Sequence, residues 1–162
     1  QIIQSAVQEA NPTLRMHAIK VGFYKSDFTA DVKDVLILPV NETNLEYDGT
    51  QNYEAVLLNY EDYSFVKSLL DATSAEFFSK NLYQIKDLLS RSLIWRAFYD
   101  MVKDAKINVT KYIEFFINNI EKEANDGLFE KQFDLVHAAI NVYTPRIGRE
   151  ALNHQVFNLI KN

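Results

Sequence analysis

The sequence of 162 residues contains no cysteine, which excludes disulfide bonds, a thiolate zinc site and a cysteine nucleophile. It also lacks any apolar run of about 18 residues, so we expect no helix that spans a membrane. No signal-peptide pattern stands at its start. Together these absences favour a reducing, cytoplasmic compartment.

Positive charge is in short supply, because 17 Lys and Arg face 22 Asp and Glu and leave a net charge of −5. The resulting pI of about 5.2 disfavours a nucleic-acid partner, whose phosphates require clustered Lys and Arg. Glycine is scarce too, with four residues, and no P-loop, G-x-G-x-x-G or G-x-S-x-G pattern occurs. The sequence therefore excludes glycine-rich phosphate loops and the nucleophile elbow of serine hydrolases.

Histidine occurs three times, as His17, His137 and His154, and none has a second histidine four residues away. A zinc peptidase of the H-E-x-x-H type needs two histidines one helical turn apart, with a glutamate as base. The three histidines are therefore interpreted as isolated core or surface residues. We predict no catalytic, cofactor-binding or metal-binding residue in this chain.

Aromatic residues are plentiful, and eleven Phe and nine Tyr predict a well-filled core. The first 70 residues show the period of two that is typical of strands, with Ile19, Val21 and Phe23 on one side of the first run. Asp48-Gly49 predicts a hairpin turn. Because no helical pattern interrupts this part, we expect antiparallel sheets in a small β-sandwich. The expected strands lie within residues 14–24, 32–40, 55–58 and 65–69.

After Asp71 the hydrophobic period changes to that of helices. Thr73 or Ser74 is expected to cap the first helix, and Asp87 to cap the second. The run from Asn125 to Gly127 is expected to end the third helix, with glycine in the left-handed position that follows a helix. Five helices with short connections predict an antiparallel array of the α-solenoid kind.

We therefore predict an α+β chain in two parts, a β-sandwich domain over residues 1–71 and an α-helical domain over residues 72–162. The chain begins at Gln1 rather than Met, and its last helix leaves an apolar face unpaired, whereas a helical array normally ends in a polar capping helix. We expect the chain to be a fragment whose helical domain is incomplete at its C-terminal end. A natural short protein is the alternative.

The candidate functional residues are Arg91 and Trp95, which fall in one predicted helix from Lys86 to Asp104. Arg91 shares the apolar face of this helix with Trp95 and Phe98. A cation on that face must pair with a carboxylate or stack on an aromatic ring, because burying it alone is costly. The first interpretation is an ion pair that locks the helical domain, and the second is a contact with a peptide carboxylate.

Two acidic clusters, at residues 61–62 and 121–123, are interpreted as solvated surface. Two glycosylation sequons begin at Asn41 and Asn108, and the sequence does not decide whether either is used.

The Trp95 helix resembles the segment that opens the C-terminal helical domain of zinc aminopeptidases of the aminopeptidase N family. In that family an Arg and a Trp four residues apart precede an aromatic-Asp-Met run, as Arg91, Trp95 and the run Tyr99-Asp100-Met101 do here. Residues 13–24 resemble the strand that begins the family's small β-sandwich domain. The end of that sandwich is similar to residues 57–63 and Leu70-Asp71.

This resemblance implies a longer parent protein that removes N-terminal residues from peptides by means of a zinc-bound water. The family's H-E-x-x-H motif, its distal glutamate ligand and its G-x-M-E-N motif have no counterpart here, so no site residue is carried over. Zinc is expected in the parent's catalytic domain. The implied partners are that domain and the peptide substrate, whose chamber this piece would shape. The alternative is a non-catalytic interaction or scaffold module in a larger assembly.

Overall fold

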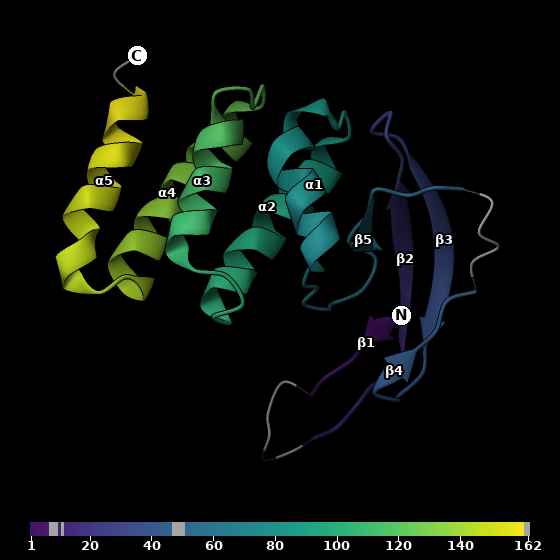
Figure 1. Cartoon of the computed structure of the whole chain (residues 1–162). Helices are drawn as coiled ribbons and strands as arrows, with labels where there is room; N and C mark the ends of the chain where they lie inside the picture. The colour runs from purple at the N-terminus through teal and green to yellow at the C-terminus, as the bar shows by residue number, and fades with distance from the viewer. Residues whose placement is uncertain (7–9, 11, 47–50, 161–162) are drawn as a thin grey trace.

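The computed structural model describes residues 1–6, 10, 12–46 and 51–160, which form antiparallel sheets followed by an array of five α-helices (Figure 1). The strands are β1 (Ile2–Ile3), β2 (His17–Tyr24), β3 (Ala30–Ile37), β4 (Glu42–Thr43) and β5 (Ala55–Tyr60). The helices are α1 (Ala72–Asn81), α2 (Leu88–Lys103), α3 (Val109–Ile120), α4 (Asp126–Tyr143) and α5 (Arg146–Ile160), with a short 3₁₀ helix, η1 (Leu82–Gln84), after α1. The predicted α+β fold class, with sheets before helices, is confirmed.

The strands form two small antiparallel sheets, one in the order β3-β2-β5 and one that pairs β1 with β4. Side chains alternate between the two faces of β2, so Ile19 and Val21 point to one face and Tyr24 to the other. Ile19 and Val21 share a buried cluster with Ile2 of β1 and with Ile37. Ile2 of the two-stranded sheet therefore packs against one face of the three-stranded sheet, and the β-sandwich domain stays a prediction.

The opposite face of the three-stranded sheet lies against the helices. Tyr24 and Leu57 belong to the same hydrophobic core as Trp95, and the ring of Tyr24 meets the ring of Phe78 edge to face, with centroids 5.1 Å apart. The last strand, β5, ends at Tyr60 and the first helix, α1, begins at Ala72. The division into two domains stays a prediction, and one continuous core joins the two parts.

The edge of β5 is closed by helix α1. The backbone N–H of Val56 donates a 2.8 Å hydrogen bond to Ser74 Oγ, and the same hydroxyl donates to Asp71 Oδ2 at 2.6 Å. Asp71 also accepts a hydrogen bond from the backbone N–H of Ser74, so Asp71 caps α1. The expectation that Thr73 or Ser74 caps this helix is therefore wrong. Ser74 lies inside α1, and its hydroxyl accepts the hydrogen bond from Val56 of the sheet instead.

The strand expected over residues 65–69 is absent, since no element lies between β5 and α1. Asn59 folds the chain back at this point by accepting from the N–H of Ser64 at 2.9 Å and donating to the Ser64 carbonyl at 2.7 Å. Just past the end of β5, Glu61 and Asp62 have positive φ angles, of 64° and 52°, which are incompatible with a continuing strand. The hairpin expected at Asp48-Gly49 lies outside the described residues.

Asparagine and aspartate side chains begin the later helices. Asp87 caps α2 as predicted, and Asn108 and Asn125 cap α3 and α4 in the same way, each accepting from a backbone N–H three residues later. The expectation that Asn125 to Gly127 ends the third helix is wrong. Helix α3 ends at Ile120, and Asn125 starts α4 instead because its side-chain oxygen binds the N–H of Leu128.

From α3 onward, each helix contacts the two helices that precede it in the sequence. Helix α3 contacts α1 and α2, α4 contacts α2 and α3, and α5 contacts α3 and α4. Aromatic rings fill the centre of this array. The ring of Phe98 stacks on that of Phe115 with centroids 3.8 Å apart, and the centroid of the Trp95 ring lies 4.3 Å from that of Phe115. Each added helix therefore covers the groove between the two helices before it.

Candidate functional site

Arg91 lies at the first turns of α2 and donates four hydrogen bonds. Its Nε and Nη2 atoms bind the two carboxylate oxygens of Glu123, at 3.0 and 2.8 Å. Its Nη1 atom binds the backbone carbonyls of Ile85 and Lys86, at 2.9 and 3.0 Å. Of the two side chains, Arg91 is 12% exposed and Glu123 2%. This arrangement is a forked, nearly buried ion pair.

Glu123 makes a further contact through the same carboxylate. Its Oε1 atom accepts a 3.1 Å hydrogen bond from the backbone N–H of Asn125, the residue that caps α4. The interpretation of residues 121–123 as solvated surface is therefore wrong for Glu123. We call the set of Arg91, Glu123, Asn125 and the carbonyls of Ile85 and Lys86 the Arg91 clasp.

The clasp joins two connections that lie far apart in the sequence, the one between η1 and α2 and the one between α3 and α4. A neighbouring contact joins η1 itself to the connection between α3 and α4, because Lys122 Nζ lies 4.2 Å from the centroid of the Tyr83 ring. A cation over an aromatic face is attracted by the electrons of the ring. Arg91 and these neighbours thus fix how α2 sits relative to the start of α4.

Trp95, the second candidate residue, is fully buried between α2 and α3. Its ring packs on Phe115 and Phe116, and its indole Nε1 is buried without a hydrogen-bond partner. Tyr112 is enclosed in the same core, and burial raises the pKa of its hydroxyl. The structure therefore places Trp95 inside the core, and its indole N–H does not reach the surface.

Asp100 follows Trp95 on α2 and is nearly buried. It lies 3.2 Å from Lys103 Nζ and 3.9 Å from Arg96 Nε, so both basic residues of this helix face compensate its charge. The hydrogen bond with Asp100 raises the pKa of Lys103. The Arg96 and Lys103 side chains of these pairs are exposed, at 57% and 42%, so the solvent screens both attractions.

The three histidines do not meet at one point. His17 lies on β2, whereas His137 of α4 and His154 of α5 both border a groove between those helices. Within the described part of the chain, no group of three or more His, Cys, Asp or Glu residues is placed to hold a metal ion.

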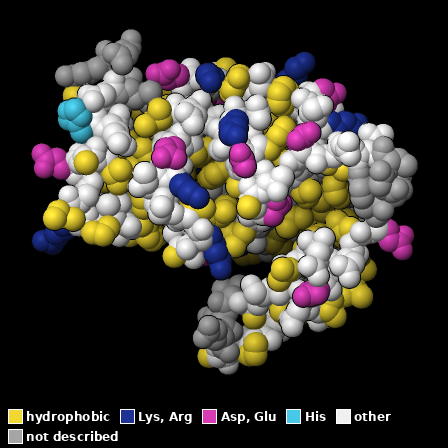
Figure 2. All heavy atoms as spheres, viewed as in Figure 1, with side chains coloured by type: hydrophobic (Ala, Val, Ile, Leu, Met, Phe, Trp, Pro, Cys, Tyr) yellow, Lys and Arg dark blue, Asp and Glu magenta, His cyan; other side chains and the backbone are white. Residues whose placement is uncertain are grey.

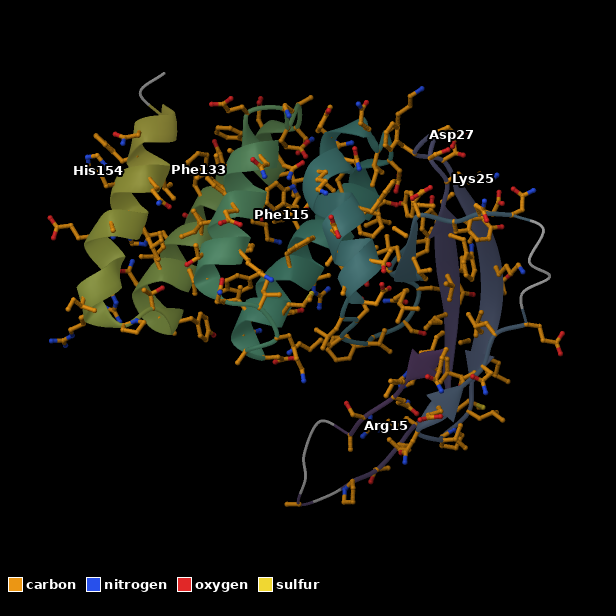
Figure 3. The ribbon with its side chains drawn as sticks, in the orientation of Figure 1. Arg15, Lys25, Asp27, Phe115, Phe133 and His154 are labelled. Atoms are coloured by element: carbon orange, nitrogen blue, oxygen red, sulfur yellow. The ribbon has the colours of Figure 1, made fainter. Side chains whose placement is uncertain are left out.

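The groove between α4 and α5 has a volume of about 550 Å³. Val136, Ile140 and Val156 form its buried floor, and Phe133 and Phe157 stand on its sides. Figure 3 shows Phe133 on α4 and His154 on α5, at the end of the array farthest from the sheet. The sequence indicated an unpaired apolar face on the last helix, and Val156 of α5 lies in this partly open groove.

Charged side chains of both signs are interspersed over the face of the helical array that Figure 2 shows. Such a mixed surface lacks the single-sign field that a phosphate backbone requires. Among the described residues, no helix combines the length and apolarity that crossing a bilayer needs.

Comparison with known proteins agrees with the family resemblance of the sequence. An alignment of length 154 that covers 89% of this chain shows 28% identity to aminopeptidase N of Streptomyces lividans. The match spans 17% of the length of that protein. No protein-family model matches the chain. The chain is thus similar to a short part of an aminopeptidase.

Proposed function

We propose that this chain is a non-catalytic part of a zinc aminopeptidase, in which it shapes the chamber that holds the peptide substrate. The observation that supports this function is the 28% identity to aminopeptidase N over 89% of the chain. The order of the matched segments adds support, because strands precede the Trp95 helix here as they do in the family it resembles.

The chemistry of the proposed parent would come from outside these residues. A zinc peptidase activates a water on a metal held by histidine and carboxylate ligands. The sequence contains no H-E-x-x-H motif. We therefore assign the zinc and the general base to a separate catalytic domain, and to this chain a supporting role in which Arg91 and Trp95 hold helices in place.

The experiment that tests this proposal starts from the intact polypeptide, purified from its source. Its mass is expected to be several times 18.8 kDa, and it should contain zinc and release N-terminal residues from peptides until a chelator removes the metal. The 162-residue chain alone should release none. An intact polypeptide near 18.8 kDa, or a longer one without zinc-dependent release, would overturn the proposal.

A second candidate is an interaction module, and the open groove between α4 and α5 favours it. This function requires that a polypeptide near 18.8 kDa stays in a stable complex in its source. Size-exclusion chromatography of native extract, with detection of the fractions by an antibody to this chain, distinguishes the two candidate functions. A free monomer of about 18.8 kDa would count against the interaction module. A much longer polypeptide would support the aminopeptidase proposal instead.

A further inference from the structure

The groove between α4 and α5 has the position that a helix occupies elsewhere in the same array. Helix α4 covers the groove between α2 and α3, and α5 covers the groove between α3 and α4. By the same rule, the next groove lies between α4 and α5, where no described element covers it. The geometry of the array therefore specifies a helix as the occupant.

The floor and sides of the groove match the apolar stripe of an amphipathic helix. Val136 and Ile140 lie four residues apart on α4, and Val156 faces them from α5. The Phe157 side chain is 53% exposed although it borders the same hollow. Helices that bind in grooves present apolar anchors three or four residues apart, which suits a floor of this spacing.

The charged side chains around the groove indicate which charge the side chains of the occupant should carry. Asp134 and Glu150 line it from α4 and α5, and neither belongs to an ion pair among the described residues. Among the residues that the structure describes, no Lys or Arg lines the groove, and its basic side chains are those of His137 and His154. Elsewhere the chain pairs exposed carboxylates with lysine, as in Lys80 with Glu76 on α1. A helix with basic residues beside its apolar stripe would supply the missing partners.

We propose that this groove seats one further amphipathic α-helix of the longer polypeptide, with Lys or Arg beside its apolar stripe facing Asp134 and Glu150. This inference rests on the proposed function, because that function supplies the longer polypeptide. A second copy of this chain fits less well, since the same acidic groove in both copies would bring like charges together.

The test uses the 162-residue chain and two labelled synthetic peptides of 16 residues. Both peptides carry the same stripe of Leu and Phe, and one has Lys and the other Glu beside it. Fluorescence anisotropy should show that the Lys peptide binds about tenfold more tightly or better, a difference of about 1.4 kcal/mol. Added salt should reduce this preference.

Matched variants locate the binding. Asp134→Asn with Glu150→Gln should bring the two peptides to nearly equal affinity, whereas Glu130→Gln, an exposed carboxylate of α4 outside the groove, should leave the preference unchanged. Phe157→Ser should weaken both peptides, and circular dichroism checks that the helices remain. Equal binding of both peptides to the unaltered chain, or no binding of either, would overturn the proposal.

Sedimentation of the chain alone tests the other occupant. A dimer that Phe157→Ser dissociates would assign the groove to a second copy and reject the helix. None of these results depends on zinc or hydrolysis, so failure of the groove proposal and failure of the aminopeptidase proposal can be told apart.

Discussion

Arg91 and Glu123, which are 32 positions apart, bind each other through two parallel hydrogen bonds of 3.0 and 2.8 Å. Both ends of this pair also hold backbone groups, the carbonyls of Ile85 and Lys86 on one side and the N–H of Asn125 on the other. The pair therefore acts on the chain path of two connections as well as on charge.

Removing one partner of this pair should destabilise the protein strongly. Arg91→Met leaves the Glu123 carboxylate buried without a cation, and we expect a loss of about 3 kcal/mol or more in the free energy of unfolding. Urea denaturation measures it. The exposed pair of Lys80 and Glu76 is the control, and Lys80→Met should change stability by less than about 0.5 kcal/mol. Equal effects of the two substitutions would contradict the assigned role of the clasp.

Truncation of Trp95 should leave a large cavity between α2 and α3. Trp95→Ala is expected to cost about 3–5 kcal/mol, because the ring is fully buried against Phe115 and Phe116. Trp95→Phe should cost less than half as much, since it keeps an aromatic ring and removes an indole N–H that has no partner. Urea denaturation of both variants gives the comparison, and similar losses would show that cavity size does not set the effect.

The Ser74 hydroxyl links the sheet to the first helix. Ser74→Ala removes the acceptor for the half-buried Val56 N–H and should cost about 1–3 kcal/mol, because this donor loses its partner. Ser79→Ala on the same helix removes only a bond to the Glu76 carbonyl and should stay within about 0.5 kcal/mol. Hydrogen exchange at Val56 should accelerate in the Ser74 variant alone. An unchanged exchange rate there would argue against the link.

Alkaline pH should weaken the junction between sheet and helices. Burial raises the pKa of Tyr24 to about 12, above its ordinary value of 10.0. Below pH 10 the hydroxyl is protonated in both states and its contribution is complete. As the pH rises from 10 to 12, the unfolded chain loses this proton and the folded chain keeps it, so stability falls, by about 2–3 kcal/mol at pH 12.

Urea denaturation at pH 8, 10 and 11 measures this fall. Tyr24→Phe should make the decline shallower, although the buried Tyr112 hydroxyl still contributes to it. Tyr63→Phe, which removes an exposed hydroxyl, is the matched control. A decline of the same slope in the Tyr24 variant and the parent chain would disprove the assignment to Tyr24.

Hydrophobic periodicity in the sequence predicted the fold class, single caps were predicted with mixed success, and contacts distant in sequence could not be predicted. Asp87 could be assigned as a cap because its partner is three residues away. Glu123 could not be assigned as the partner of Arg91, since no local pattern distinguishes a paired glutamate from a solvated one. The missing strand at residues 65–69 has a local cause, because Asn59 turns the chain through contacts with Ser64 that hydrophobic periodicity does not reveal.

The contact between Val56 and Ser74 also bears on how the sheet resists aggregation. Pairing with another chain needs free backbone groups at a sheet edge, and α1 already occupies the Val56 donor on β5. Growth of the sheet is therefore directed to the outer edge of β3, where Asp31, Lys33 and Asp34 interrupt the apolar run. Charges on an exposed edge oppose strand addition, so helix and charge protect the two opposite margins of the same sheet.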